Sequence, residues 1–261
     1  MRLVIKLGGA ALDNPALLDR CAHVLGALAR QGHRVALVHG GGSALTRTLQ
    51  QLGKRSEFVN GLRVTDAETR DVALMVLAGI INKRLVAALA RSGQPAVGFC
   101  GGDALSFRAR QRNSNGRDLG FVGDVCEADP GWLELIWARG ALPVVASLAL
   151  GLDGEYYNVN ADQMAAACAV ACRADALVFL TDVPGVWDVE RTLIARLHAA
   201  QIAELADRAA IVGGMLPKLE ACKRALAGGV PHVRILPAAE VERLAHGEIT
   251  NVEVGTEVVA R

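Results

Sequence analysis

A lysine and a pair of glycines lie at the end of the first apolar segment of this chain. Lys6 interrupts the apolar run 3–7, and Gly8 and Gly9 follow directly. An unpaired ammonium group is costly inside a protein, so Lys6 in a buried strand would need a nearby anion. Glycine lets an anion approach the backbone N–H groups because no side chain stands in the way. The segment alone fits an edge-strand lysine that extends to water beside a tight turn equally well.

Three further places carry residues of similar chemistry. Glycines follow an apolar run at 39–42, amides and a carboxylate gather at 158–162, and a Thr-Asp-Val-Pro-Gly turn lies at 181–185. A second lysine, Lys218, follows the glycine pair 213–214. Ligands of open α/β sheets bind at the carboxyl ends of the strands, so parallel strands would align these loops along one edge. The pattern favours an anion such as a nucleotide, although neither a P-loop nor a G-x-G-x-x-G fingerprint is present.

The apolar periodicity predicts the elements that must position these residues. Two strand–glycine–helix units near the start of the chain predict a parallel sheet with crossover helices, and we expect a three-layer α/β/α sandwich around a mostly parallel central sheet. Strands are expected at 3–7, 34–39, 96–100, 142–146, 176–180, 232–236 and 255–259, and helices at 15–31, 133–138, 163–172 and around Lys218.

Three segments carry more specific expectations. Residues 54–64 are expected to form a hairpin or lid around the turn signal Asn60-Gly61. A long helix is expected from residue 65 or 66 to about 91, with Met75 and Ile80 on its apolar face. Residues 108–121 are rich in Arg, Asn and Gly and are expected to be an exposed excursion.

Composition narrows the class of protein. The chain has 261 residues, 52% of them hydrophobic and 21% charged, which predicts a globular fold with a sizeable core. A net charge of +1 and 4% aromatic residues argue against a nucleic-acid partner. The six cysteines form no C-x-x-C pair and no zinc-like spacing with histidine, so we expect no protein-bound metal site. With no signal-peptide pattern and no obvious membrane span, a reducing cytoplasm and no membrane partner are expected.

Over essentially its whole length the sequence resembles the amino acid kinase family. The glycine and lysine motifs are shared across that family, whereas 60–65 and 158–162 are typical of the branch that acts on N-acetyl-L-glutamate. The segments that carry the resemblance are Ile5-Lys6-Leu7-Gly8-Gly9, Val38-His39-Gly40-Gly41-Gly42, Asn60-Gly61-Leu62-Arg63-Val64-Thr65, Leu119-Gly120-Phe121-Val122-Gly123, Asn158-Val159-Asn160-Ala161-Asp162, Leu180-Thr181-Asp182-Val183-Pro184-Gly185-Val186 and Gly213-Gly214-Met215-Leu216-Pro217-Lys218.

The resemblance implies transfer of the γ-phosphoryl group of ATP, with Mg²⁺ held mainly by ATP oxygens and water, onto the side-chain carboxylate of N-acetyl-L-glutamate in arginine biosynthesis. A carboxylate with a reference pKa of about 4.3 is already ionised, so no general base is needed. The difficulty is the approach of one anion to another. Catalysis should therefore come from positioning and from positive charge at the transferring group.

The same resemblance assigns roles to individual residues. Lys6 and Lys218 would contact the transferring phosphoryl group from two sides, and Asp162 would hold both lysines. The remaining assignments are backbone N–H groups of Gly8, Gly9, Gly41 and Gly42 for the phosphates, Gly41, Gly42, Arg63 and Asn158 at the acceptor, and Thr181, Asp182 and Gly185 along the nucleotide.

Other interpretations stay open on the sequence alone. Asp162 could simply cap the following helix, and Lys218 could lie on a solvated helix face. A hydrolase could use Cys100 as nucleophile with His198 or His232 as base, although Lys6 and Lys218 would then have no role. A non-catalytic sensor and a sister kinase for an acetyl- or carrier-bound aminoadipate or glutamate are further alternatives.

The family's organisation gives the remaining expectations. An N-terminal lobe, 1–173, would bind the acyl amino acid and dimerise, and a C-terminal lobe, 174–261, would bind ATP. Arginine-inhibited members carry an extra helix before the first strand. This chain begins at that strand, so we expect a homodimer that arginine does not inhibit.

Overall fold

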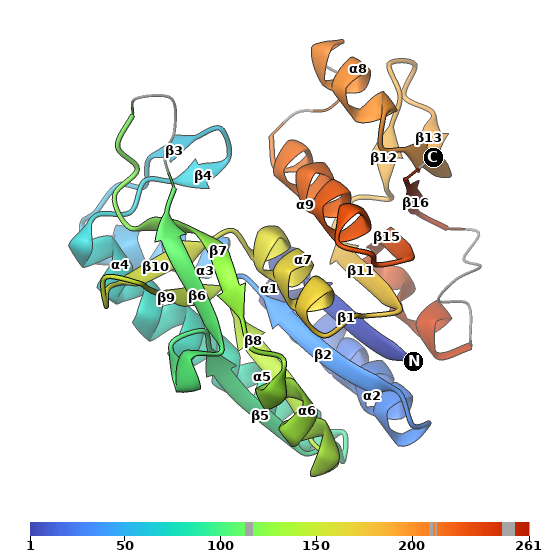
Figure 1. Ribbon diagram of the computed structural model, residues 1–261, viewed down its shortest axis with the longest axis horizontal. Helices are drawn as coiled ribbons and strands as arrows, with labels where there is room; N and C mark the ends of the chain where they lie inside the picture. Colours follow the sequence, from blue (N-terminus) through green and yellow to red (C-terminus); the bar gives the residue numbers. More distant parts are fainter. Residues whose placement is uncertain (113–116, 209–210, 212, 247–253, 261) are drawn as a thin grey trace.

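The computed structural model describes residues 1–112, 117–208, 211, 213–246 and 254–260 (Figure 1). The elements follow one another in the order β1 Arg2–Leu7, α1 Gly9–Asp13, α2 Pro15–Arg30, β2 Arg34–His39, α3 Gly42–Gln51, β3 Phe58–Val59, β4 Leu62–Arg63, α4 Ala67–Ala73, η1 Leu74–Ile81, α5 Asn82–Arg91, β5 Ala96–Cys100, η2 Asp103–Leu105, β6 Phe107–Gln111, β7 Val122–Ala128, α6 Gly131–Ala138, β8 Leu142–Ala146, β9 Leu148–Gly151, β10 Tyr156–Val159, α7 Ala161–Ala171, β11 Ala176–Thr181, β12 Val186–Trp187, β13 Leu193–Ile194, β14 Arg196–His198, α8 Gln201–Asp207, α9 Met215–Ala227, β15 His232–Pro237, η3 Ala238–His246 and β16 Thr256–Val259.

The main sheet has eight strands in the order β14-β16-β15-β11-β1-β2-β8-β5. The six strands from β15 to β5 run parallel, and β16 is antiparallel to β15. The expected mostly parallel sheet and its terminal strand are thus confirmed. The carboxyl ends of β11, β1 and β2 lie side by side, which brings together three of the loops singled out in the sequence.

A second, smaller sheet of four strands, β10-β7-β6-β9, closes on itself beside the first. Its strand β10 leads directly into α7, so the fourth loop, 158–162, reaches the edge of the main sheet from this separate sheet (Figure 1). Residues 108–121 were expected to be an exposed excursion, but 108–111 belong to strand β6, in which Arg110 and Gln111 are exposed as expected and Ala109 is not. Phe107 and Ala109 of β6 are buried in the core, and residues 113–116 lie outside the described part.

Helices cover both faces of the main sheet, as expected for a three-layer sandwich (Figure 1). Side chains alternate along β1, so Leu3, Ile5 and Leu7 face one core with α2, α3 and α5. Val4 faces the other core with α7 and α9. Lys6 alternates onto this second face, toward α7.

The long helix expected from residue 65 or 66 is continuous through α4, η1 and α5, but its middle is a π-helical segment. Asp66 caps its start by accepting a hydrogen bond from the Thr69 N–H at 2.8 Å. The wider π turn shifts the phase of the helix, and Met75 and Ile80 are exposed. Their expected place on the buried face is therefore wrong.

One helix among the described residues, Ala67–Arg91, is long and apolar enough to cross a membrane by length and composition. The sequence-based expectation that the apolar stretches are too short or too interrupted to span a bilayer does not hold for this helix by length and composition alone. Half of its most apolar window is buried inside the molecule, as in the core helix of a soluble protein. The hairpin expected at 54–64 is present as β3 and β4 around Asn60 and Gly61, both with positive φ.

Candidate active site

Lys6, Asp162 and Lys218 meet at the carboxyl edge of the main sheet. The Lys6 ammonium lies 2.9 Å from Asp162 Oδ1, and the Lys218 ammonium lies 3.1 Å from both Asp162 oxygens. All three residues are less than 10% exposed. The Lys218 ammonium also lies over the Phe179 ring, 5.2 Å from its centroid. One carboxylate thus joins two lysines that are far apart in the sequence.

The first turns of α7 and α9 hold this arrangement. Asn160 caps α7, because its side-chain oxygen accepts hydrogen bonds from the N–H groups of Asp162 and Gln163 at 2.9 and 3.2 Å. The Asp162 carboxylate is therefore free to pair with the lysines, and its interpretation as the helix cap is wrong. Gln163 Nε2 donates to Pro217 O at 3.2 Å and ties α7 to the start of α9. Lys218 is buried there, so it is no solvated surface lysine.

Burial and the neighbouring opposite charges have opposing effects on the pKa values of Lys6 and Asp162. Burial is the largest effect on Lys6 and lowers its pKa, and the neighbouring Lys218 lowers it further, while Asp162 opposes both. Burial raises the pKa of Asp162, but the two lysines outweigh it and hold that pKa below its usual value. Asp162 is therefore ionised near neutral pH, and Lys6 depends on it to stay charged. The arrangement can place positive charge against an incoming anion.

Glycines bring the backbone close to these lysines. A Cβ on Gly41, whose φ is +154°, would lie 2.1 Å from Ile81 Cδ1, so any larger residue would have to displace that side chain where the loop passes η1. A Cβ on Gly8 would lie 3.0 Å from Leu180 O. The Gly8 N–H already donates to that carbonyl at 3.0 Å, so the expected free N–H at Gly8 is wrong. Gly9, Gly41 and Gly42 line the cavity beside Lys6.

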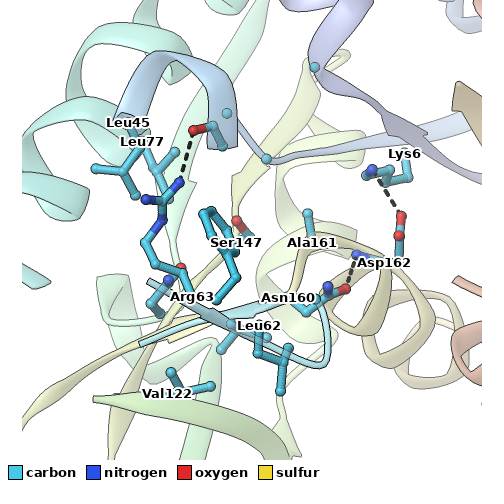
Figure 2. A pocket seen from close by; sticks show the side chains of 18 residues that line it. Lys6, Leu45, Leu62, Arg63, Leu77, Val122, Ser147, Asn160, Ala161 and Asp162 are labelled. Carbon is cyan, nitrogen blue, oxygen red and sulfur yellow. Dashed lines mark hydrogen bonds and ion pairs between the residues drawn. The ribbon is translucent and has the colours of Figure 1, made fainter. Parts of the chain in front are cut away.

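That cavity has a volume of about 210 Å³, with Lys6 and Asp162 at one end and Arg63 at the other (Figure 2). Arg63 is 6% exposed and donates to Gly42 O at 3.0 Å, to Thr46 Oγ1 at 2.8 Å and to Ser56 Oγ. Burial lowers the Arg63 pKa. Asn158 also lines this cavity, and its amide donates to Thr65 Oγ1 at 3.2 Å.

Thr181 ends β11, and Asp182 and Gly185 follow it in the next loop. Thr181 Oγ1 donates to Asp182 Oδ1 at 3.1 Å. Gly185 lines a second cavity of about 490 Å³. The walls of that cavity include Val183, Val186, Trp187, Asp188, Val189, Arg191, Arg208, Ile211 and Met215. The predicted acceptor residues thus line the first cavity, whereas of these three nucleotide residues only Gly185 lines the second, and Thr181 and Asp182 line neither.

Sequence reasoning missed several residues of these walls. Ser147, Leu62 and Leu77 line the first cavity, and Trp187 and Arg208 line the second. Ser147 follows β8 without a glycine, and the others stand in ordinary polar or apolar runs, so no local pattern marks them. Asn160 was within a singled-out motif, and its position two residues before Asp162 is a typical capping signal.

The hydrolase interpretation fails on geometry. Cys100 is buried at the carboxyl end of β5, and burial raises its pKa to about 11. His232 begins β15, which is separated from β5 by four strands and lies at the opposite edge of the parallel strands. His198 lies in β14, beyond β15. Only the three-residue η2 follows Cys100 closely, so the helix that a nucleophile elbow requires is absent there.

A mostly parallel α/β sandwich with two lysines, a bridging carboxylate and glycine-rich loops at its carboxyl edge defines a phosphotransferase of the α/β class. The sequence profile described as "Amino acid kinase family" matches residues 1–237. The chain belongs to this family.

Several known proteins are similar along the whole chain. The "Acetylglutamate kinase" of Acidobacterium capsulatum is 60% identical over 260 residues and covers 100% of both chains. That of Koribacter versatilis is 52% identical over 260 residues, covering 100% of this chain and 99% of the relative. The crystal structure of smu.665 from Streptococcus mutans UA159 superposes with a TM-score of 0.83 at 27% identity, over 100% of this chain and 99% of that one.

Proposed function

We propose that this protein transfers the γ-phosphoryl group of ATP to the side-chain carboxylate of N-acetyl-L-glutamate, forming N-acetyl-L-glutamyl 5-phosphate and ADP. The Lys6–Asp162–Lys218 cluster is the observation that carries the proposal. It is buried, it is next to a cavity of small-metabolite size, and it supplies two cations held by one anion. The names of the full-length relatives support the same reaction and its place in arginine biosynthesis.

The reaction requires the protein mainly to supply positive charge at the transferring phosphoryl group and to position the two substrates. The acceptor carboxylate is an anion near neutral pH and attacks without a general base. As the bond between the γ-phosphorus and its bridging oxygen breaks, negative charge spreads over the transferring group. Lys6 and Lys218 would stabilise this charge from two sides, and Asp162 would keep both ammonium groups ionised and in place.

Arg63 supports the choice of a carboxylate-bearing acceptor. It is buried, and among the described residues no acidic side chain pairs with it. Its partners are two hydroxyls, one carbonyl and the Phe58 ring, whose centroid lies 4.6 Å from Arg63 Cζ, and none of them carries a negative charge. A substrate carboxylate at this end of the cavity would do so, and the planar guanidinium suits a bidentate pair. Asn158 would contact the acetamido group or a carboxylate from the cavity wall.

The second cavity is the proposed nucleotide site, so the lobe 174–261 would bind ATP and the lobe 1–173 the acceptor. Its wall contains the ring of Trp187 and the side chains of Arg191 and Arg208. The glycine N–H groups and the lysines fit a polyphosphate. Mg²⁺ would be held mainly by ATP oxygens and water, where it neutralises phosphate charge. Among the described residues, no group of three His, Cys, Asp or Glu side chains could hold a metal.

A homodimer in the cytoplasm completes the proposal. Met75 and Ile80 of η1 and Val97 of β5 are exposed apolar side chains, and η1 contacts β5. Strand β5 is also an edge of the main sheet with no neighbour on one side. A second copy of the chain could cover both features. All six cysteines are free, as a reducing compartment requires.

The test follows ADP release and traps the acyl phosphate with hydroxylamine. With N-acetyl-L-glutamate, ATP and Mg²⁺, we expect equal amounts of ADP and of the hydroxamate. The same assay with N-acetyl-aminoadipate decides the acceptor, because a higher kcat/KM on the longer substrate would overturn our choice. Absence of ADP and hydroxamate with both acceptors would refute the reaction.

Matched variants on α9 tie the activity to the site. Lys218→Ala removes the buried lysine, and kcat is expected to fall by about two to three orders of magnitude. Lys223→Ala removes an exposed lysine of the same helix and should leave kcat unchanged. Equal activity of the two variants would contradict the assignment of Lys218.

A further inference from the structure

His39 is a buried histidine next to the cavity, and it has not been given a function. It ends β2, is fully buried, and is absent from the cavity wall, whereas Gly40, Gly41 and Gly42 line that wall. Its ring makes two contacts. Nδ1 lies 2.8 Å from Gly40 O, and Nε2 lies 3.1 Å from Asn82 Nδ2.

The network around Asn82 settles which ring nitrogen carries the hydrogen. Asn82 Nδ2 also lies 3.0 Å from Val144 O, which can only accept, so this end of the side chain is the NH₂ group. The other end, Oδ1, accepts from Lys83 Nζ at 3.1 Å. His39 Nε2 must therefore accept from Asn82. Burial lowers the pKa of His39 to about 4, so the neutral ring carries its one hydrogen on Nδ1 and donates it to Gly40 O.

This hydrogen bond holds the orientation of the peptide between Gly40 and Gly41. No cis peptide occurs in the described chain, and in a trans peptide the N–H points away from the C=O. With the Gly40 carbonyl held toward the buried ring, the Gly41 N–H is directed away from that ring, and Gly41 itself lines the cavity whereas His39 does not. Within the described residues, the Gly41 N–H donates to no backbone carbonyl.

Packing prevents the loop from moving out of this position. Ile81 and Leu77 of η1 lie so close to Gly41 that a Cβ there would be 2.1 and 2.9 Å from their methyl groups. Asn82 follows directly after η1 and is likewise confined, because a Cβ on Gly98 would lie 1.9 Å from its Oδ1. The π-helical segment η1 thus forms the wall behind Gly41, and the residue that follows it, Asn82, supplies the amide that orients His39.

We propose that His39 is a positioning residue whose Nδ1–H holds the Gly40 carbonyl and thereby aims the Gly41 N–H at the transferring phosphoryl group. The inference rests on the proposed kinase reaction and adds a residue to it. An oriented N–H group directed at developing charge stabilises the transition state, and its misorientation lowers kcat. A histidine that only filled the core would affect folding and would leave kcat of the folded enzyme unchanged.

Two substitutions separate the two ring nitrogens. His39→Asn places an amide nitrogen at the position of Nδ1 and keeps a donor for Gly40 O, but it loses the acceptor for Asn82. His39→Gln places its amide at the position of Nε2 and keeps the Asn82 partner, but it loses the donor to Gly40. We expect His39→Asn to keep kcat within about threefold of the unmodified protein, and His39→Gln to lower kcat by about tenfold or more. The KM for ATP should change little in His39→Asn.

Melting temperature is recorded for both variants as the control for folding. Because Asn82 loses a partner only in His39→Asn, this variant should be the less stable of the two while remaining the more active. Activities that follow the melting temperatures, or a fully active His39→Gln, would overturn the inference.

A second measurement does not depend on the acceptor. Calorimetry compares binding of the Mg²⁺ complexes of AMP-PNP and ADP, which differ by the terminal phosphate. In His39→Gln the preference for AMP-PNP over ADP should fall by about fivefold or more, and in His39→Asn it should persist. An unchanged preference in His39→Gln would overturn the inference. If the unmodified protein binds both nucleotides and phosphorylates neither acceptor, the proposed function fails, and the comparison of the two variants still decides the role of His39.

Discussion

Asp162→Asn is the perturbation that most directly tests the electrostatic account of the site. The substitution keeps the size of the side chain and removes the charge that two lysines share at 2.9 and 3.1 Å. At an effective dielectric constant of about 20, each such pair attracts by about 5–6 kcal/mol before desolvation is subtracted. Removing one partner of a buried ion pair costs about 3–5 kcal/mol. We expect a loss of this size in the free energy of unfolding by urea.

The effect on catalysis has a specific pH signature. Burial and Lys218 already lower the pKa of Lys6, and Asp162 is what opposes them. Without the carboxylate this pKa falls further, so Lys6 loses its proton at a lower pH. Because the charged form is the active one, the alkaline limb of the kcat–pH profile should shift toward lower pH by about one unit or more. Near neutral pH kcat should fall by about two to three orders of magnitude, with partial recovery on acidification.

Asp66→Asn is the matched control. Asp66 is also paired with a lysine, Lys54, at 2.6 Å, but it lies on the surface at the start of α4. Asparagine caps helices as well as aspartate, so stability and the kcat–pH profile should both change little. If Asp162→Asn instead kept kcat within about threefold and left the alkaline limb unshifted, the carboxylate would not be what keeps the lysines charged.

Three further predictions concern the cavity and its loop. Arg63→Lys keeps the positive charge but loses the planar guanidinium, so the KM for the acceptor should rise by about tenfold while the KM for ATP is unchanged. An equal rise in both KM values would contradict a role of Arg63 in binding the acceptor. Gly41→Ala places a methyl group against Ile81 and should lower the free energy of unfolding, measured by urea titration, by about 1–3 kcal/mol. A variant whose urea midpoint equals that of the unmodified protein would contradict this packing argument. His39 is held neutral in the fold with a pKa of about 4, against about 6.5 when unfolded, so the unfolded chain binds more protons between these values. Stability should therefore fall by up to about 3 kcal/mol as pH drops from 6.5 to 4, and His39→Asn should remove this part of the pH dependence measured by urea unfolding.

Local patterns were sufficient for much of the fold. The strand around Ile5, the glycine loop after His39 and the helix that carries Lys218 could be predicted because each has a strong apolar period and a clear terminating signal. Two expectations failed where a distant contact decides the outcome. The arginine-rich run that includes β6 looks like a loop, but its alternate side chains Phe107 and Ala109 pack into a second sheet. Met75 was placed on the buried face because a π-helical segment cannot be read from an apolar period of 3.6.

The candidate active site, too, was partly predictable from local sequence and partly decided by contacts between distant segments. Lysines beside glycines indicate a site for an anion, and the family resemblance names candidates for each role. The sequence does not show that Asn160 rather than Asp162 caps α7, which is what frees the carboxylate for two lysines. It also does not show that the Gly8 N–H is already used by Leu180. These facts depend on which groups meet, and hydrogen-bond partners from distant segments leave no local pattern.

By itself, then, the sequence determined the class of fold, the chemistry of the site and the position of Lys6 at the end of a buried strand. Only the tertiary structure decided that Lys6 is not an edge lysine extended to water. It lies in the middle of an eight-stranded sheet, faces α7 because side chains alternate along β1, and finds there the carboxylate it shares with Lys218. The physical reason is burial: a buried ammonium group must meet an anion, and the fold alone determines which anion is within reach.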